Sequence, residues 1–118
     1  MYTISKEFYF SASHKLHKLP ESHPCGRIHG HNYVVIVHLK SKELDDEGFV
    51  KDYRELQLIK EYIDKEWDHR HLNSLLLHPT AENIAELFYN VCKNGFRMKQ
   101  VYAVTVKETD KTEATYCE

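Results

Sequence analysis

Histidine stands out in this sequence, with 9 among 118 residues. His29, Gly30 and His31 are consecutive, and a strand through them would project both imidazoles from one face, roughly 6.6 Å apart along the chain. Neutral imidazole is a preferred zinc ligand, and catalytic zinc sites use three protein ligands with one position open. His14 is the best third ligand, because its strand is expected to pair with the strand of His29. Three histidines satisfied by ordinary hydrogen bonds are the alternative interpretation.

A second pair, His69 and His71, follows a predicted helix, where no strand alternation sets the direction of the rings. Asp68 beside His69 suits a different task, because a carboxylate can orient an imidazole and hold the tautomer that proton transfer needs. A histidine near the negative end of a helix dipole explains the same residues. The sequence leaves both interpretations open.

Cys25 lies four residues before His29 in a tight loop. A free thiol has a pKa of about 8.5, and a nearby imidazolium, guanidinium or metal ion lowers it, which would make Cys25 a base or nucleophile at neutral pH. The alternative is a small buried apolar residue. Cys92 and Cys117 fit that alternative better.

Glu108 continues the even register of Val104 and Val106, so a carboxylate points to the face of the sheet that should be apolar. Burying it is costly unless it is paired or binds the donor groups of a ligand. An edge position facing water is the alternative. Three basic residues near the predicted metal loop suit an anionic substrate group and a solvated loop equally well: Lys15, Lys18 and Arg27.

Period-two alternation positions these side chains. It predicts a strand from Tyr2 that places His14 on the buried face if it persists that far, and a second strand over His29–Lys40. Two further strands are predicted at the C-terminal end, one from Tyr102 into Glu108 and a short one through Ala114 and Tyr116.

Two helices are predicted between the strand pairs. Asp52, with Glu55 three residues later, resembles a capping box that opens the first helix, whose apolar stripe is Leu56, Ile59, Ile63 and Trp67. The second follows Pro79, with Thr80 as N-cap and Gly95 as the stop signal; its core positions are Ile84, Leu87, Phe88 and Val91. The order β-β-α-α-β-β predicts an α+β domain, with a four-stranded antiparallel sheet and two helices on one face.

Composition limits the class of protein. With 42% hydrophobic and 29% charged residues, 118 residues form one globular domain over 1–118. The net charge of −2 argues against nucleic acid as the main partner. The absence of a long apolar run or a secretory N-terminal pattern gives the expectation of a cytoplasmic protein without membrane contact. The three cysteines form no CxxC pair, so a zinc knuckle or disulfide framework is not expected.

Taken together, the motifs resemble the 6-pyruvoyltetrahydropterin synthase family. The similarity covers nearly the whole chain in five ordered segments: Phe10–His14, Cys25–Tyr33, Asp68–Asn73, Pro79–Asn83 and Val106–Thr109. The short Cys-x-x-x-His-Gly-His spacing is similar to that of bacterial 6-carboxytetrahydropterin synthases of queuosine biosynthesis. Trp67 stands where the family has leucine, which removes no reactive group.

The resemblance implies a tunnelling fold whose protomers form trimeric barrels that stack as hexamers, with active sites at subunit interfaces. By carry-over, His14, His29 and His31 bind Zn²⁺, and Cys25 is the catalytic base. Asp68 and His69 form a proton-transfer pair. Glu108 anchors the pterin, and Thr80 and Glu82 belong to the pterin-binding wall.

The implied reaction is zinc-dependent conversion of 7,8-dihydroneopterin triphosphate to 6-carboxytetrahydropterin, acetaldehyde and triphosphate. Two alternatives stay open on the sequence. The first is pyruvoyl formation, in which triphosphate is eliminated and no carbon–carbon bond is cleaved. The second is a non-catalytic metal- or pterin-binding module, although binding alone would not require Cys25, Asp68 and His69 together.

Overall fold

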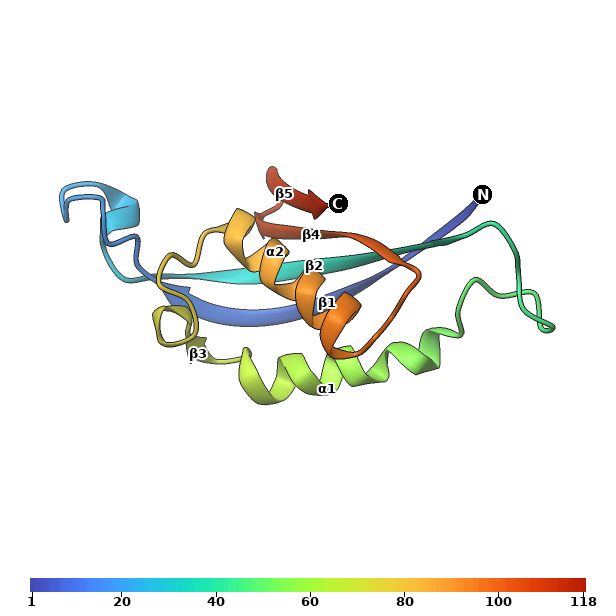
Figure 1. Cartoon of the computed structure of the whole chain (residues 1–118). Helices are drawn as coiled ribbons and strands as arrows, with labels where there is room; N and C mark the ends of the chain where they lie inside the picture. The colour runs from blue at the N-terminus through green and yellow to red at the C-terminus, as the bar shows by residue number, and fades with distance from the viewer.

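The computed structural model describes residues 1–118 as a twisted sheet with two helices on one face (Figure 1). Five strands in the order β3-β1-β2-β4-β5 form the sheet: β1 (Tyr2–His14), β2 (His29–Ser41), β3 (Arg70–His71), β4 (Val101–Thr109) and β5 (Thr112–Cys117). The helices are α1 (Gln57–Glu66) and α2 (Ala81–Asn90). The predicted α+β class and element order are confirmed, and neither helix has the length and apolar content that a bilayer span needs.

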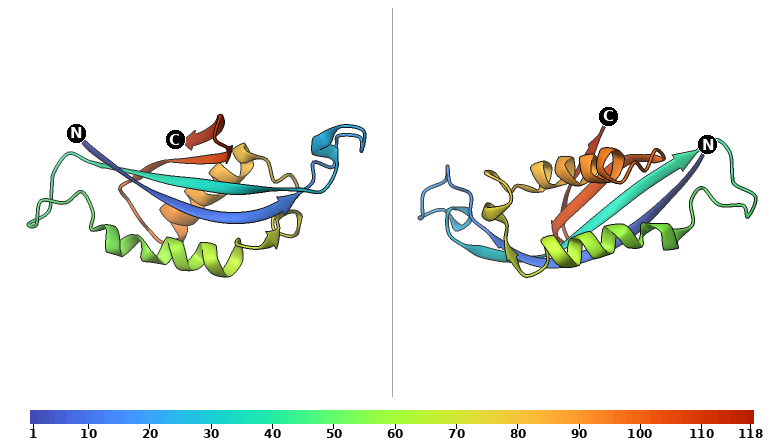
Figure 2. Two further views of the ribbon diagram at one scale, coloured as in Figure 1. Left: turned by 180° about the vertical axis from the view of Figure 1, so that it is seen from behind. Right: turned by 60° about the horizontal axis from the view of Figure 1, so that its bottom comes forward.

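β1 and β2 form one long antiparallel ladder, which extends from Tyr2 opposite Ser41 to His14 opposite His29. Their alternation follows the prediction. The inward side chains are buried under the helices, and these include Phe8, Phe10, Tyr33 and Val35. Since the ladder continues unbroken to its last pair, the two histidines are direct cross-strand neighbours. The loop that joins His14 to His29 projects beyond the end of the sheet (Figure 2).

The prediction of four strands was wrong by one. β3 has two residues, Arg70 and His71, and it pairs parallel to β1 at Ala12 and Ser13. Its polar sequence carries no alternation that could reveal a strand. It forms because His69, with a positive φ of 59°, turns the chain after α1 and donates its backbone N–H to the Ser11 carbonyl at 2.7 Å.

The start of α1 also differs from prediction. Asp52 caps a 3-10 turn over Tyr53–Leu56 through the backbone N–H of Arg54 at 2.9 Å, and α1 follows that turn. The Glu55 carboxylate pairs with the Lys51 ammonium at 3.7 Å. The predicted capping box, in which Glu55 would bind the backbone of Asp52, is therefore not formed. The predicted apolar stripe is confirmed, because all four of its residues are buried: Leu56, Ile59, Ile63 and Trp67.

α2 begins and ends as predicted. Thr80 Oγ1 accepts a hydrogen bond from the backbone N–H of Asn83 at 3.2 Å, and a single π turn over Val91–Gly95 ends the helix. Ile84 and Phe88 are fully buried, whereas Leu87 and Val91 are half-buried. An aromatic cluster joins the layers: Phe10 stacks on Tyr33 at 4.8 Å between ring centroids, and Trp67 packs on Phe88 at 4.7 Å. This packing lines the inner face of β1 and β2 as far as Tyr33, two residues from His31.

Candidate metal centre and active site

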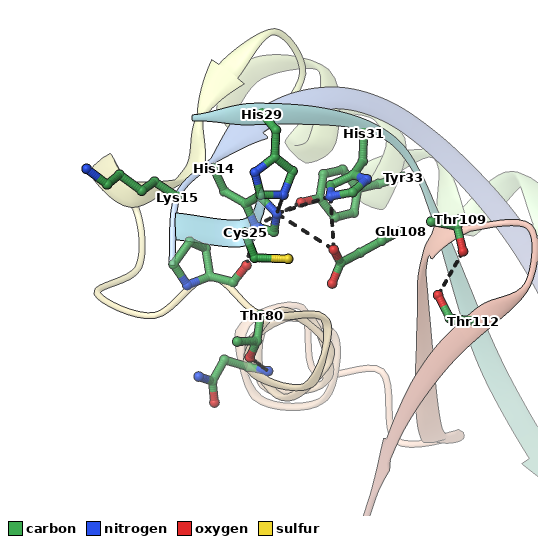
Figure 3. Close-up of polar contacts among 12 residues, drawn as sticks. His14, Lys15, Cys25, His29, His31, Tyr33, Thr80, Glu108, Thr109 and Thr112 are labelled. Carbon is green, nitrogen blue, oxygen red and sulfur yellow. Dashed lines mark hydrogen bonds and ion pairs between the residues drawn. The ribbon is translucent and has the colours of Figure 1, made fainter. Parts of the chain in front are cut away.

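Three imidazoles converge at the end of the β1–β2 ladder, as predicted (Figure 3). His14 Nε2 lies 2.9 Å from His29 Nε2 and 3.2 Å from His31 Nε2. His14 and His29 face each other across the two strands, and His31 follows on the same face two residues later. His14 is only 1% exposed, so its ring is part of the core as well as of the cluster.

Backbone carbonyls decide the tautomers of two of the three rings. His14 Nδ1 donates to the Pro79 carbonyl at 2.7 Å, and His29 Nδ1 donates to the Arg27 carbonyl at 2.8 Å. A carbonyl can only accept, so each ring carries its hydrogen on Nδ1 and presents a lone pair at Nε2. Two lone pairs facing each other at 2.9 Å repel unless a cation lies between them. The donor set therefore fits a metal ion that prefers neutral imidazole, such as Zn²⁺.

Glu108 reaches the same point from β4. Its Oε2 lies 3.1 Å from His31 Nε2 and 3.7 Å from His14 Nε2, which confirms the predicted inward direction of this carboxylate. Burial lowers the pKa of His31; the Glu108 charge works against this, and the other two imidazoles add to it. Burial, with the Glu108 charge, also raises the pKa of Tyr33. A neutral His31 keeps the lone pair that metal binding requires.

Cys25 lies in a 3-10 turn over Pro24–Gly26, inside the loop that joins β1 to β2. Its carbonyl accepts the backbone N–H of Leu16 at 2.9 Å, and its own N–H donates to His23 Nδ1 at 3.1 Å. These bonds fold the loop back beside the end of β1. The thiol is half-buried and points into the space between the imidazoles and Glu108 (Figure 3). The side chain of Lys15 points away from that space (Figure 3).

The turn around Cys25 depends on Gly26. A Cβ at this position would lie 2.0 Å from the Pro20 carbonyl oxygen, so no other residue fits without moving the loop backbone. The close approach of the two loop segments therefore sets where the thiol lies.

Asp68 and His69 form the predicted pair, with His69 Nδ1 3.0 Å from Asp68 Oδ2. The backbone N–H of Ser11 donates to Asp68 Oδ1 at 2.9 Å, and this bond, with that of His69, lowers the pKa of the Asp68 carboxyl. The His69 side chain is 83% exposed.

Within one chain, Asp68 and His69 do not reach the cluster of three imidazoles. His69 lines a cavity of about 600 Å³ with Ser11, Ser13 and Asn32. These three residues alternate along the strands with the inward side chains, so the cavity is on the opposite face of the sheet. His71 Nδ1 lies 2.9 Å from Ser13 Oγ on that face and takes no part in the cluster.

Thr80 and Glu82 lie at the N-terminal end of α2. The Thr80 hydroxyl is used as the helix cap, whereas Glu82 is exposed and lines a cavity of about 490 Å³. Glu108 lines the same cavity, together with residues of β5. The Glu108 carboxylate therefore lies between the imidazole cluster and an open polar pocket.

The structure adds residues to which sequence reasoning gave no role. Tyr33 Oη lies 3.2 Å from His14 Nδ1, beside the Pro79 carbonyl. Asn73 binds both backbone polar groups of Lys15. The sequence could have indicated Tyr33, because it lies two residues after His31 on the same inward face of the strand. The role of the Pro79 backbone carbonyl could not be predicted, because every residue has a carbonyl.

Comparison with known proteins agrees with this geometry. The family model described as 6-pyruvoyl tetrahydropterin synthase matches residues 3–118. A putative 6-carboxy-5,6,7,8-tetrahydropterin synthase of Archaeoglobus fulgidus is 33% identical over 93 residues, which cover 78% of this chain and 77% of that protein. A 6-carboxy-5,6,7,8-tetrahydropterin synthase of Synechocystis is 32% identical over an alignment of 128 positions, which covers 98% of this chain and 93% of that protein.

A solved structure agrees as well. That of Caenorhabditis elegans 6-pyruvoyl tetrahydropterin synthase superposes with a TM-score of 0.86 and 30% identity, covering 99% of this chain and 95% of that one. The family model spans nearly the whole chain, and the similarity extends to the three-dimensional structure. The chain belongs to the 6-pyruvoyl tetrahydropterin synthase family.

Proposed function

We propose that this protein is a zinc-dependent 6-carboxy-5,6,7,8-tetrahydropterin synthase of queuosine biosynthesis. It would convert 7,8-dihydroneopterin triphosphate and one molecule of water to 6-carboxytetrahydropterin, acetaldehyde and triphosphate. The observation that carries the proposal is the convergence of three imidazole nitrogens with Glu108, at the point toward which the Cys25 thiol is directed. The names of the Archaeoglobus and Synechocystis relatives support the carboxy product.

His14, His29 and His31 would hold the Zn²⁺ through their Nε2 atoms. The bound ion supplies Lewis-acid polarisation of the substrate's side-chain hydroxyls. Cys25, as thiolate, would take a proton from a neighbouring C–H group. Its half-buried thiol points into the space between the imidazoles and Glu108, where the C–H group of a metal-bound substrate would lie.

Glu108 would anchor the pterin ring. A carboxylate has acceptors only, and the pterin presents an amino group and a ring N–H that both donate, which gives a two-point fit. The cavity of about 490 Å³ that Glu108 shares with Glu82 is the space for this ring. Thr80 would contribute by fixing the start of α2 beside it.

Asp68 and His69 would complete the site of a second copy of the chain. They face the opposite side of the sheet from their own metal cluster, so their proton-transfer role requires a neighbouring protomer. The outer edge of β1 is paired only at Ala12 and Ser13, and β5 has no neighbour on its outer side. Edge-to-edge pairing would close a homo-trimer, and two trimers would stack as a hexamer.

Mixing two inactive variants tests this shared site. Cys25→Ala and His69→Ala protomers, mixed in equal amounts and reassembled, should regain about a quarter of wild-type activity, because that share of interfaces combines an intact thiol with an intact imidazole. A site contained in one chain would give no recovery.

Product analysis tests the reaction. The purified, zinc-loaded protein is incubated with 7,8-dihydroneopterin triphosphate, and acetaldehyde and pterin products are measured by mass spectrometry. Acetaldehyde with 6-carboxytetrahydropterin supports the proposal. A pyruvoyl product without acetaldehyde would identify triphosphate elimination alone, the activity named for the Caenorhabditis relative. Turnover of neither kind would leave a binding module.

The role of the thiol has a matched control in the chain. Cys25→Ala should abolish turnover while the metal stays bound, and Cys117→Ala, at an exposed cysteine near the C-terminus, should leave turnover unchanged. Full activity in Cys25→Ala would exclude the thiol as the base.

A further inference from the structure

The turn that carries Cys25 begins at His23. This residue is the N-cap of the 3-10 turn over Pro24–Gly26, with extended backbone angles of φ −83° and ψ 134°. His23 Nδ1 accepts a hydrogen bond from the backbone N–H of Cys25 at 3.1 Å, and the His23 carbonyl accepts that of Gly26 at 2.9 Å. The ring and the main chain of one residue therefore bind the two N–H groups that follow Pro24.

The backbone of Cys25 is held at both of its polar groups. Its N–H binds His23, and its carbonyl accepts the backbone N–H of Leu16 at 2.9 Å. The loop lies beyond the end of the sheet, so no strand pairing fixes this residue (Figure 2). The two hydrogen bonds set the direction of the Cα–Cβ bond, and one torsion angle then places the sulfur. Of the two bonds, that from His23 is made by a side chain and can be removed by substitution.

We propose that His23 is a positioning residue for Cys25, and that its Nδ1 lone pair holds the turn in the conformation that directs the thiol into the candidate site. The inference rests on the proposed function, which makes Cys25 the base. His23 is exposed and belongs neither to the imidazole cluster nor to the cavity that Glu108 lines. It acts on the reaction only through Cys25.

Two substitutions separate the hydrogen bond from the rest of the ring. Nδ1 of histidine and Oδ1 of asparagine are both attached to Cγ, so His23→Asn keeps an acceptor close to the same point, and asparagine is a preferred N-cap. His23→Ala removes the acceptor. Ser22→Ala changes an exposed residue of the same loop and is the matched control.

Kinetics on the zinc-loaded protein measure the effect on the reaction. His23→Ala should lower kcat at least about tenfold, because a displacement of about 1 Å can cost a factor of about 100. KM should change less than about twofold, since the thiol acts in the chemical step and does not bind the substrate. His23→Asn should restore most of kcat, and Ser22→Ala should equal wild type.

Protection of the thiol gives a readout that is independent of turnover. Each protein is treated with iodoacetamide, with and without Zn²⁺ and neopterin, which carries the pterin ring and side-chain hydroxyls but no phosphate. In wild type, Ser22→Ala and His23→Asn, Zn²⁺ with neopterin should slow alkylation of Cys25 at least about tenfold, because the ligand covers a thiol that points into the site. In His23→Ala the protection should be lost. Zn²⁺ titration and circular dichroism establish that every variant is folded and binds the metal.

Wild-type kcat and protection in His23→Ala would overturn the inference. Losses in His23→Ala that His23→Asn does not repair would also overturn it, because the acceptor would not be the group that matters. Absence of protection in wild type would show that the thiol does not face the ligand, and the inference would fall with the role of Cys25. Protection that depends on His23 in a protein without turnover would instead refute the proposed reaction and support the positioning role.

Discussion

The carboxamide of Asn73 pairs with both backbone polar groups of Lys15: the Lys15 N–H donates to Asn73 Oδ1 at 2.8 Å, and Asn73 Nδ2 donates to the Lys15 carbonyl at 2.8 Å. β1 ends at His14, one residue earlier. The Asn73 side chain therefore takes the place of a neighbouring strand where the ladder stops, and it ties the loop before α2 to the residue that follows His14, a candidate metal ligand.

Replacing Asn73 should loosen this end of β1. Asn73→Asp keeps an acceptor for the Lys15 N–H but places a second acceptor against the Lys15 carbonyl, so we expect a loss of roughly 1–3 kcal/mol in the free energy of unfolding. Binding of Zn²⁺ should weaken as well, because His14 is no longer held. Urea unfolding and competition with a chelator measure the two effects.

Asn94→Asp is the matched control for Asn73, because the Asn94 side chain bonds only to Asn90 on the exposed end of α2. It should change neither quantity. If Asn73→Asp bound Zn²⁺ as tightly as wild type, the hydrogen bonds between Asn73 and Lys15 would not affect the position of His14.

Removing the metal should lower thermal stability. A ligand that binds only the folded state, present at 100 times its dissociation constant, stabilises it by about 2.7 kcal/mol. Calorimetry should therefore give wild type a higher melting temperature with Zn²⁺ than with excess EDTA. For His31→Ala the two melting temperatures should be equal. His69→Ala, whose ring is 83% exposed and outside the cluster, should keep the wild-type difference.

Asp68 should contribute stability that depends on pH. The Ser11 N–H, with His69, lowers the pKa of the Asp68 carboxyl below its usual 3.8. A carboxyl with a lowered folded-state pKa stabilises the fold above its unfolded-state pKa and loses that contribution as the pH falls through the folded-state value. Asp68→Asn should thus be less stable than wild type at pH 7, and the gap should narrow below about pH 4. Urea unfolding from pH 7 to pH 3 measures the gap, and a constant gap would contradict the assignment.

The three cysteines should react differently with iodoacetamide. Cys92 is fully buried, and burial raises the pKa of its thiol to about 12, so it should stay unmodified in the folded protein. Cys25 is half-buried and Cys117 exposed, so both should be alkylated. Zn²⁺ with pterin should slow the modification of Cys25 alone, because only that thiol points into the candidate site. Peptide mass spectrometry counts the modified sites, and equal protection of Cys117 would show that the effect is not local.

The sequence alone determined which face of β1 and β2 is buried. Side chains alternate along an extended chain, so the apolar residues at even positions of β1 and odd positions of β2 place His14, His29 and His31 on one face, and Glu108 continues the register of Val104 and Val106 toward the same face. A helix cap also depends on residues close in sequence, and Thr80 was predicted as the N-cap of α2 from its place after Pro79. Metal-ligand candidates follow from alternation together with residue type.

Only the tertiary structure decided how segments far apart in the sequence meet. β3 forms because hydrogen bonds to Ser11 bring a polar segment beside β1, and no local pattern encodes such a pairing. The ladder register sets His14 opposite His29, and the position of β4 brings Glu108 within 3.1 Å of His31. The outward direction of His69 follows from a turn with positive φ after α1. These features depend on long-range hydrogen bonds and packing, whereas alternation reports only the local conformation of the chain.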